Sequence, residues 1–318
     1  MYFQNFVQLS KKKNGTLDDK KNIIEHDGDT YILRFLNSET DQQKGGNSSV
    51  YELVDPNGNL PNSAIKISKV YKPYRTANKK IKRRYGRFIN EIDALKKAKE
   101  IGLNHVVEII FDGIIEIQGK TFPYFVMEKA DTDLGSFLIN NELDEQERVF
   151  FMVQIFDAIQ QLHSLGIYHR DIKPDNIFVF YQNEEESEES KFVWKIGDLG
   201  LIKLREKEFD GVGEKIGPFG FISPEVMNKV LTEKKKIGFD CNIDGSSDVF
   251  QLGLLFWFII QNNVPLGQIT KDDFIADIKN KESFFKIIFQ MLQHSKDRRI
   301  SMDDLEDELS GIKKEYVI

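Results

Sequence analysis

The sequence predicts an α+β protein with a small, sheet-rich first part and a larger, mostly helical second part. Before about residue 129, short apolar runs rich in β-branched and aromatic residues alternate with turn signals. After it, apolar residues recur at helical spacing over long segments. Polar motifs stand between the two patterns. Such a change along the chain indicates two lobes around a cleft.

The bulk composition fits a globular protein that folds in a reducing compartment. The chain has 318 residues, of which 40% are hydrophobic and 30% charged. Its net charge of −7 gives no overall attraction to nucleic acid or to an anionic membrane. The single cysteine, Cys241, excludes an internal disulfide framework.

No segment has the pattern of a membrane span or of a secretion signal. The longest apolar run, Val249–Ile260, has 12 residues, whereas a membrane helix needs about 20. The start, Met1–Phe6, lacks a cationic stretch followed by an apolar block. We therefore expect a buried core helix at 249–260 and a cytoplasmic or nucleoplasmic protein.

The first part divides into an extension and a lobe. Residues 1–30 are mostly polar and predict an N-terminal extension, and residues 31–128 predict the sheet-rich lobe. Its first expected strands are Tyr31–Leu36, the segment around Val50–Leu53, and Ala64–Ile67. The turn signal at 55–58 predicts a hairpin between the last two.

One main helix interrupts the expected strands of this lobe. A basic stretch, Lys79–Arg87, leads into a helix with Ile89, Ile92 and Leu95 on one face. The basic stretch is either a solvated face or a dock for an acidic partner, and the first reading is favoured. Further apolar runs predict strands at 106–111, 113–117 and 122–127.

The second part, residues 129–318, predicts mainly helices. Helical periodicity marks segments at 150–165, 249–260, 282–293 and 301–312. A hairpin is expected between Phe178–Tyr181 and Phe192–Ile196. The acidic segment Glu184–Ser190 lengthens its connection and reads as a solvated loop.

Two polar motifs carry the chemistry. The first, His169–Asn176, places Asp, Lys and Asn at Asp171, Lys173 and Asn176, and the second is Asp198 followed by Leu and Gly. They resemble the H-R-D-x-K-x-x-N catalytic loop and the D-F-G motif of eukaryotic-type protein kinases. The resemblance covers about residues 31–309 in the family's order, and it implies the bilobal protein-kinase-like fold.

The resemblance implies a role for each of these polar residues. Asp171 would accept or orient the proton of a substrate hydroxyl, and Lys173 would neutralise the γ-phosphate. Asn176 and Asp198 would hold Mg²⁺ through oxygen, the ligand type that this cation prefers. Leu199 stands where the family has Phe, in a packing position.

The first lobe would supply most of the ATP contacts. Ala64-Ile65-Lys66 resembles the family's V-A-I-K, which points Lys66 toward the α- and β-phosphates, and Glu91 resembles its ion-pair partner. A lysine and a glutamate that never meet are the alternative. The glycine-rich lid is reduced, because only Gly45, with Gly46 beside it, remains of the pattern. The other implied adenine contacts are the gatekeeper Met127, the backbone of Glu128 and Ala130, and the flanking side chains of Val50, Ala64 and Phe178.

Residues 217–225 resemble G-T-x-x-Y-x-A-P-E. In the family its final glutamate, here Glu225, pairs with an arginine near the C-terminus. Arg299 is the best candidate and Arg298 the alternative. Asp248 begins a segment similar to D-x-W-x-x-G, with Phe250 in place of Trp.

Two departures from the family bear on specificity and control. Pro218 stands where serine/threonine kinases have Thr, and a proline there resembles tyrosine kinases. Lys173, however, is the serine/threonine form of the catalytic loop, so serine/threonine specificity is favoured and dual specificity stays open. Residues 201–222 contain no Ser, Thr or Tyr. Two alternatives follow: one of their carboxylates replaces a loop phosphate by pairing with Arg170, or the acids are solvated on the loop. The candidates are Glu206, Glu208, Asp210 and Glu214.

The sequence therefore predicts a kinase that transfers the γ-phosphate of ATP to a protein substrate, with Mg²⁺. A pseudokinase that serves as a binding or scaffold module is the main alternative, supported by the reduced lid and Pro218. A small-molecule phosphotransferase of related fold is the other. Neither nucleic acid nor a membrane is an expected partner, and the oligomeric state does not follow from the sequence.

Overall fold

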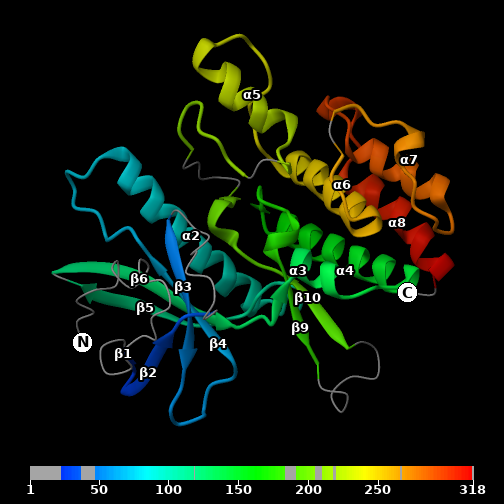
Figure 1. The fold of residues 1–318 in the computed structure, drawn as a ribbon. Helices are drawn as coiled ribbons and strands as arrows, with labels where there is room; N and C mark the ends of the chain where they lie inside the picture. Colours follow the sequence, from blue (N-terminus) through cyan, green and yellow to red (C-terminus); the bar gives the residue numbers. More distant parts are fainter. Residues whose placement is uncertain are drawn as a thin grey trace. The chain divides into compact units, whose positions relative to one another are not determined.

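The computed structural model divides the chain into two units. It describes residues 23–36, 47–117, 119–182, 191–204, 210–217, 220–265 and 267–316. The first unit comprises residues 1–102 and 107–129, and the second comprises residues 103–106 and 130–318. The first is rich in strands and the second in helices (Figure 1), which confirms the predicted α+β class.

An antiparallel sheet forms the first unit. Within the described residues it has six strands in the order β1-β2-β3-β4-β6-β5. Alternate residues of β3 are buried, as the two-residue period of a strand with one covered face requires. The predicted hairpin across residues 55–58 joins β3 to β4. The strands are β1 (Ile23–His26), β2 (Asp29–Arg34), β3 (Ser48–Val54), β4 (Ser63–Ser68), β5 (Ile109–Ile117) and β6 (Lys120–Glu128).

Strand β1 lies within the stretch expected to be an extension. It pairs with β2 through a tight turn in which Asp27 and Gly28 both have positive φ. The ring of His26 stacks on Phe111 at 4.1 Å and its Nδ1 lies 2.9 Å from the Tyr124 hydroxyl. These partners are about a hundred residues away, so a polar-looking local sequence gave no sign of the strand.

The two strands predicted at 106–111 and 113–117 are one strand, β5. Its register shifts between Ile109 and Phe111, and Gly113 continues the strand instead of breaking it. Glycine is required there because a Cβ would lie 2.6 Å from the Tyr124 hydroxyl oxygen. Val106, expected in the same strand, instead forms a bridge with Ile196 in the second unit.

Helix α2 (Lys79–Glu100) packs on the sheet of the first unit. Asn78 caps it by accepting a hydrogen bond from the Ile81 N–H. Ile92 and Leu95 are buried, as the helical spacing predicted, and Phe88 is buried with them. Ile89, which was expected on the same face, is only partly buried. The same face carries Glu91, and the helix therefore sets the position of this carboxylate.

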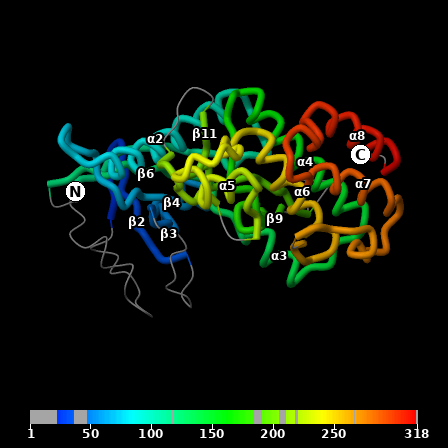
Figure 2. Tube along the Cα trace, turned by 90° about the horizontal axis from the view of Figure 1, so that it is seen from above, coloured from blue at the N-terminus to red at the C-terminus, as the bar shows by residue number. Residues whose placement is uncertain are grey.

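The second unit is built on the buried helix α6 (Gly245–Gln261). Nearly all of its residues from 247 to 259 are buried, as expected of a core helix. Figure 2 shows α4, α6, α7 and α8 grouped within this unit. Periodicity located these four helices but missed α3 and α5. The other helices are α3 (Leu134–Asn140), α4 (Glu145–Ser164), α5 (Pro224–Thr232), α7 (Lys281–Met291) and α8 (Met302–Tyr316).

Short strands surround the polar motifs of this unit. Strands β9 (Ile177–Tyr181) and β10 (Phe192–Ile196) pair antiparallel as predicted. Strand β9 also pairs with β7 (Thr132–Asp133), and β8 (Ile167–Tyr168) pairs with β11 (Lys203–Leu204). The acidic segment 184–190 lies outside the described residues. None of the helices in the described part of the chain is long and apolar enough to cross a membrane.

Candidate active site

A buried ion pair joins the central sheet of the first unit to its helix. The Lys66 Nζ on β4 lies 2.6 Å from Glu91 Oε1 on α2, and both side chains are almost inaccessible. The ammonium also lies 5.8 Å from the centre of the Phe125 ring. A buried lysine needs such a partner to remain charged. The pair predicted from the sequence is therefore present.

The remaining predicted residues of the first unit lie on adjacent strands. Val50 is opposite Lys66 in the β3–β4 pairing, and Ala64 is opposite Met127 in the β4–β6 pairing. Glu128 ends β6, and its carboxylate accepts a 2.7 Å hydrogen bond from the Glu108 N–H. Gly45 and Gly46 lie outside the described residues.

Two predicted adenine contacts belong to the second unit. Ala130 is its first residue after the sheet, and Phe178 lies on β9, opposite Lys195 and Asp133. Phe178 is partly exposed, whereas its strand neighbours Ile177 and Val179 are buried. Its side chain is therefore on the less buried face of β9.

The catalytic-loop residues of the second unit meet as the motif predicts. Asn176 Nδ2 donates to both the backbone oxygen and Oδ2 of Asp171, at 2.7 and 2.9 Å. Lys173 Nζ lies 3.5 Å from the same Oδ2. Asp171 Oδ1 is buried and has no hydrogen-bond partner among the described residues. One carboxylate oxygen is thus fixed, and the other is left to accept a proton or a hydrogen bond.

Burial raises the pKa of Asp171 above its ordinary value. Lys173, His169 and the Asn176 amide oppose the shift, whereas Asp198 adds to it. A raised pKa makes the carboxylate a stronger base than an exposed aspartate, and the ionised form is lost as the pH falls through this raised value. This stronger basicity suits a proton acceptor.

Asn176 and Asp198 each carry a side-chain oxygen that could serve as a metal ligand. Because the Asn176 amide turns its Nδ2 toward Asp171, its Oδ1 is left without a hydrogen bond among the described residues. The Gly197 N–H donates to the Asn176 backbone oxygen at 2.9 Å and so ties the two motifs together. Asp198 is exposed and has positive φ, and Leu199 is fully buried as its packing role predicts. This donor set fits a hard divalent cation such as Mg²⁺.

Arg170 has a left-handed backbone, with φ of 65°. This conformation is unfavourable for a residue with a long side chain. The buried Asp248 carboxylate on α6 stabilises it by accepting hydrogen bonds from the N–H groups of His169 and Arg170, at 2.8 and 2.7 Å. It also lies 2.8 Å from His163 Nε2. The catalytic loop is thus held by the core helix.

The side chain of Arg170 pairs with one of the four acids that the sequence singled out. Its Nη1 and Nη2 lie 2.5 and 3.2 Å from the two carboxylate oxygens of Asp210. Nε and Nη2 also donate to the backbone oxygens of Leu201 and Ile202. Glu214 instead accepts from the Gly211 N–H, and Glu206 and Glu208 lie outside the described residues.

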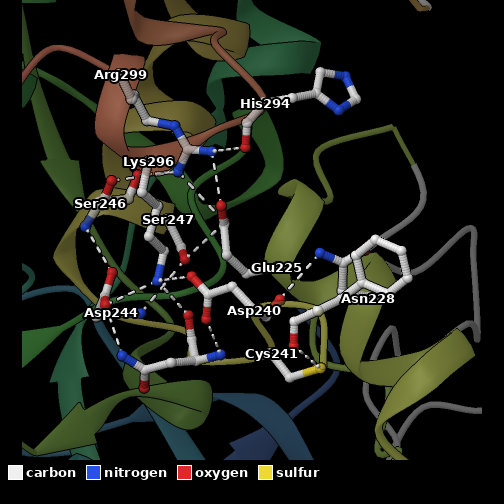
Figure 3. A network of polar contacts seen from close by, with 12 residues as sticks. Glu225, Asn228, Asp240, Cys241, Asp244, Ser246, Ser247, His294, Lys296 and Arg299 are labelled. Carbon is white, nitrogen blue, oxygen red and sulfur yellow. Dashed lines mark hydrogen bonds and ion pairs between the residues drawn. The ribbon is translucent and has the colours of Figure 1, made fainter. Parts of the chain in front are cut away.

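The pair expected between Glu225 and Arg299 is also present (Figure 3). The Arg299 Nη2 lies 2.8 Å from Glu225 Oε1, and both residues are buried. Arg298, the alternative, is exposed. Nearby, the Lys296 ammonium lies between the carboxylates of Asp240 and Asp244, at 3.0 and 2.9 Å. These contacts tie α5 and the start of α6 to the segment before α8.

Residues 43–311 match the protein kinase domain. The chain belongs to this family. Its kinase motifs, identified above from the sequence, occur in that matched range in the family's order.

The kinase domain is similar to curated serine/threonine kinases. Serine/threonine-protein kinase cds1 of Schizosaccharomyces pombe is 28% identical over 300 residues, which are 89% of this chain and 59% of that protein. Mitogen-activated protein kinase HOG1 of Cochliobolus heterostrophus is 28% identical over 217 residues, 68% of this chain and 52% of that protein. The kinase spans about half the length of these relatives.

Gln251 is a residue of this site that sequence reasoning did not single out. Its carboxamide, on α6, contacts the backbone of the catalytic loop. The signal was present, because a glutamine inside the apolar run 249–260 is unusual and a buried amide needs partners. Nothing local to the run indicated where those partners lie.

Proposed function

We propose that this kinase domain transfers the γ-phosphate of ATP to a protein hydroxyl, with Mg²⁺ as cofactor. The observation that carries the proposal is the state of Asp171, a buried carboxylate with one oxygen fixed by Asn176 and the other without a partner in the described structure. A pseudokinase has no need of such a group. The buried Lys66–Glu91 pair supports the same reading, because it holds a cation ready for phosphate.

The proposed reaction uses each group once. The substrate hydroxyl donates its proton to Asp171 Oδ1 while its oxygen bonds to the γ-phosphorus. The bond from that phosphorus to the bridging oxygen of ADP breaks, and ADP keeps the electron pair. Lys173 offsets the negative charge on the γ-phosphoryl group, and Lys66 holds the α- and β-phosphates. Most of the rate enhancement would come from positioning and charge neutralisation.

Asn176 and Asp198 are the residues that would hold Mg²⁺. The cation, when bound, neutralises phosphate charge. The chain's own part is to orient the two ligands. The Asn176 side chain does so by using its N–H groups on Asp171, which keeps its oxygen available.

We infer that serine and threonine are the acceptors. Lys173 is the serine/threonine form of the catalytic loop, and relatives similar to this chain carry the name of serine/threonine-protein kinase or mitogen-activated protein kinase. Pro218, which resembles the tyrosine-kinase form, lies outside the described residues. The peptide assay described below tests whether tyrosine is also an acceptor.

We further propose that the kinase is active without a phosphate in its activation segment. Kinases with an arginine before the catalytic aspartate commonly use it to hold that phosphate. In this chain the Nη1 and Nη2 groups of this arginine, Arg170, instead bind the two carboxylate oxygens of Asp210. Both side chains are only 2% exposed, so the pair is shielded from solvent and salt. Asp210 supplies permanently the negative charge that phosphorylation would supply reversibly.

The deciding experiment is a radiolabelled ATP assay on phosphatase-treated protein. Wild type and Asp171→Ala would be compared, with Mg²⁺, on serine, threonine and tyrosine peptides and on small-molecule alcohols. We expect transfer to serine and threonine by the wild type and a loss of at least about 100-fold in the variant. ATP binding without phosphate transfer would establish a pseudokinase. Transfer only to small alcohols would establish a small-molecule phosphotransferase. If phosphatase treatment abolished activity, this would refute only the proposal that the kinase is active without a phosphate in its activation segment.

A further inference from the structure

Gln251 is a fully buried polar side chain in the core helix of the second unit. It is 1% exposed, and the other residues from 249 to 255 are apolar or glycine. Burying an amide without hydrogen bonds costs about 1–3 kcal/mol in proteins. A glutamine at this position therefore needs a compensating set of partners.

The Gln251 carboxamide makes three hydrogen bonds to backbone groups. Its Oε1 accepts from the Ile172 N–H at 3.0 Å, and its Nε2 donates to the backbone oxygens of Arg170 and Phe221, at 3.2 and 2.9 Å. Both N–H donors of the amide are thereby used. No shorter or apolar side chain could make this set.

The three bonds join two functional segments. Arg170 and Ile172 are the residues on either side of Asp171, so the amide fixes the peptide groups that carry the catalytic carboxylate. Phe221 lies in the segment just before Ser223–Glu225, which in the family builds the platform for the protein substrate. One side chain thus links the base to the substrate platform.

Gly217 shows how closely this arrangement is packed. It has φ of 89°, and a Cβ there would lie 3.4 Å from the Arg170 oxygen. The same point is 3.7 Å from both Asp171 Oδ1 and Gln251 Nε2. Because residue 217 is glycine, it places no side chain against Asp171 Oδ1 or against the Gln251 amide.

The next residue in the chain explains why a link from α6 is useful. Position 218 is proline, which has neither a side-chain hydroxyl nor a backbone N–H to donate. Residue 218 therefore cannot donate a hydrogen bond to the catalytic loop, whereas the Gln251 amide donates to the Arg170 oxygen of that loop.

We propose that Gln251 is a positioning residue: by holding the peptide groups on either side of Asp171 and tying them to Phe221, it sets the protein substrate against Asp171. The inference rests on the proposed kinase function. It assigns Gln251 no contact with ATP, so its loss should affect the protein substrate and leave nucleotide binding alone.

Two variants remove different subsets of the three hydrogen bonds of Gln251. Gln251→Met keeps the length of the side chain and removes every hydrogen bond. Gln251→Glu keeps the acceptor for the Ile172 N–H and removes both N–H donors. Gln154→Met is the matched control, because it makes the same exchange on α4, where the Gln154 Oε1 is buried without a partner in the described structure.

We expect both Gln251 variants to lose about 10- to 100-fold in kcat/KM for a peptide substrate, since small misplacements of reacting groups have effects of this size. The KM for ATP should stay within about twofold of wild type, and Gln154→Met should match wild type in both. Equal losses for ATP and peptide, or no loss per folded molecule, would overturn the inference. If Gln251→Met does not fold, Gln251→Glu decides.

Hydrogen exchange gives a readout that does not depend on activity. The Ile172 amide should exchange faster in Gln251→Met than in wild type, because its acceptor is gone, and should be unchanged in Gln154→Met. Unchanged Ile172 exchange refutes the inference even in an active enzyme. A wild type that transfers no phosphate refutes the proposed function, and exchange then still decides whether Gln251 holds the loop.

Discussion

Two buried arginine–carboxylate pairs in the second unit use the same chemistry for different ends. Arg299 pairs with Glu225, and Arg170 pairs with Asp210. In both, the planar guanidinium faces two carboxylate oxygens, and backbone oxygens accept its remaining N–H groups. Neither pair is open to solvent.

The pairs differ in what they connect. The Glu225 carboxylate also accepts from the Ser247 hydroxyl, so this pair ties α5, the start of α6 and the segment before α8 into one framework. The Arg170 pair joins a single loop to the segment at 210–217. The first pair should therefore matter mainly for stability and the second mainly for activity, although their local geometry is alike.

The largest effect on stability should come from Arg299→Ala. It leaves the buried Glu225 carboxylate without its cation, and breaking such a pair costs about 3–5 kcal/mol. Thermal or urea unfolding measures the loss, which approaches the whole stability of many domains. A loss below about 1 kcal/mol would show that water replaces the arginine and that the framework does not depend on it.

Asp210→Asn should have a smaller effect on stability and a larger one on activity. The amide keeps one acceptor oxygen, so we expect a loss of about 1–3 kcal/mol. Activity per folded molecule should fall by about tenfold or more, because Arg170 loses the charge that orders the 210–217 segment. Peptide phosphorylation and urea unfolding of the same samples measure both.

The control for this variant is Glu214→Gln. It removes a charge from the same segment, where Glu214 accepts from the Gly211 N–H, a bond that glutamine can keep. If both variants lost activity equally, net charge in the segment rather than the Arg170 contact would be responsible.

The smallest effect should come from an exposed pair. Lys286 and Glu308 lie 2.8 Å apart with side chains 60% and 37% exposed. Exposed pairs contribute about 0–1 kcal/mol, so Lys286→Ala should change stability by no more than that and leave activity unchanged. A loss similar to that of Arg299→Ala would mean that burial does not explain the difference between the pairs.

How far the sequence predicted these features depends on how local the signal is. The Glu225–Arg299 and Lys66–Glu91 partners each stand in a recognisable motif, and their pairing could be expected before the structure. Asp210 was one of four acids, and only the path of the segment distinguishes it from Glu214. Strand β1 depends on His26 meeting Phe111 and Tyr124, which no local pattern reveals.

The two hydrogen bonds from Asp248 to the catalytic loop have a consequence for local unfolding. Asp248 is part of the most buried helix in the second unit, and its carboxylate accepts from the N–H groups of His169 and Arg170. For these amides to open, either α6 must move or a buried charge must lose its donors. The catalytic loop therefore belongs to the same cooperative folding unit as the core helix. Although it is a loop by secondary structure, it should open about as rarely as the centre of the protein.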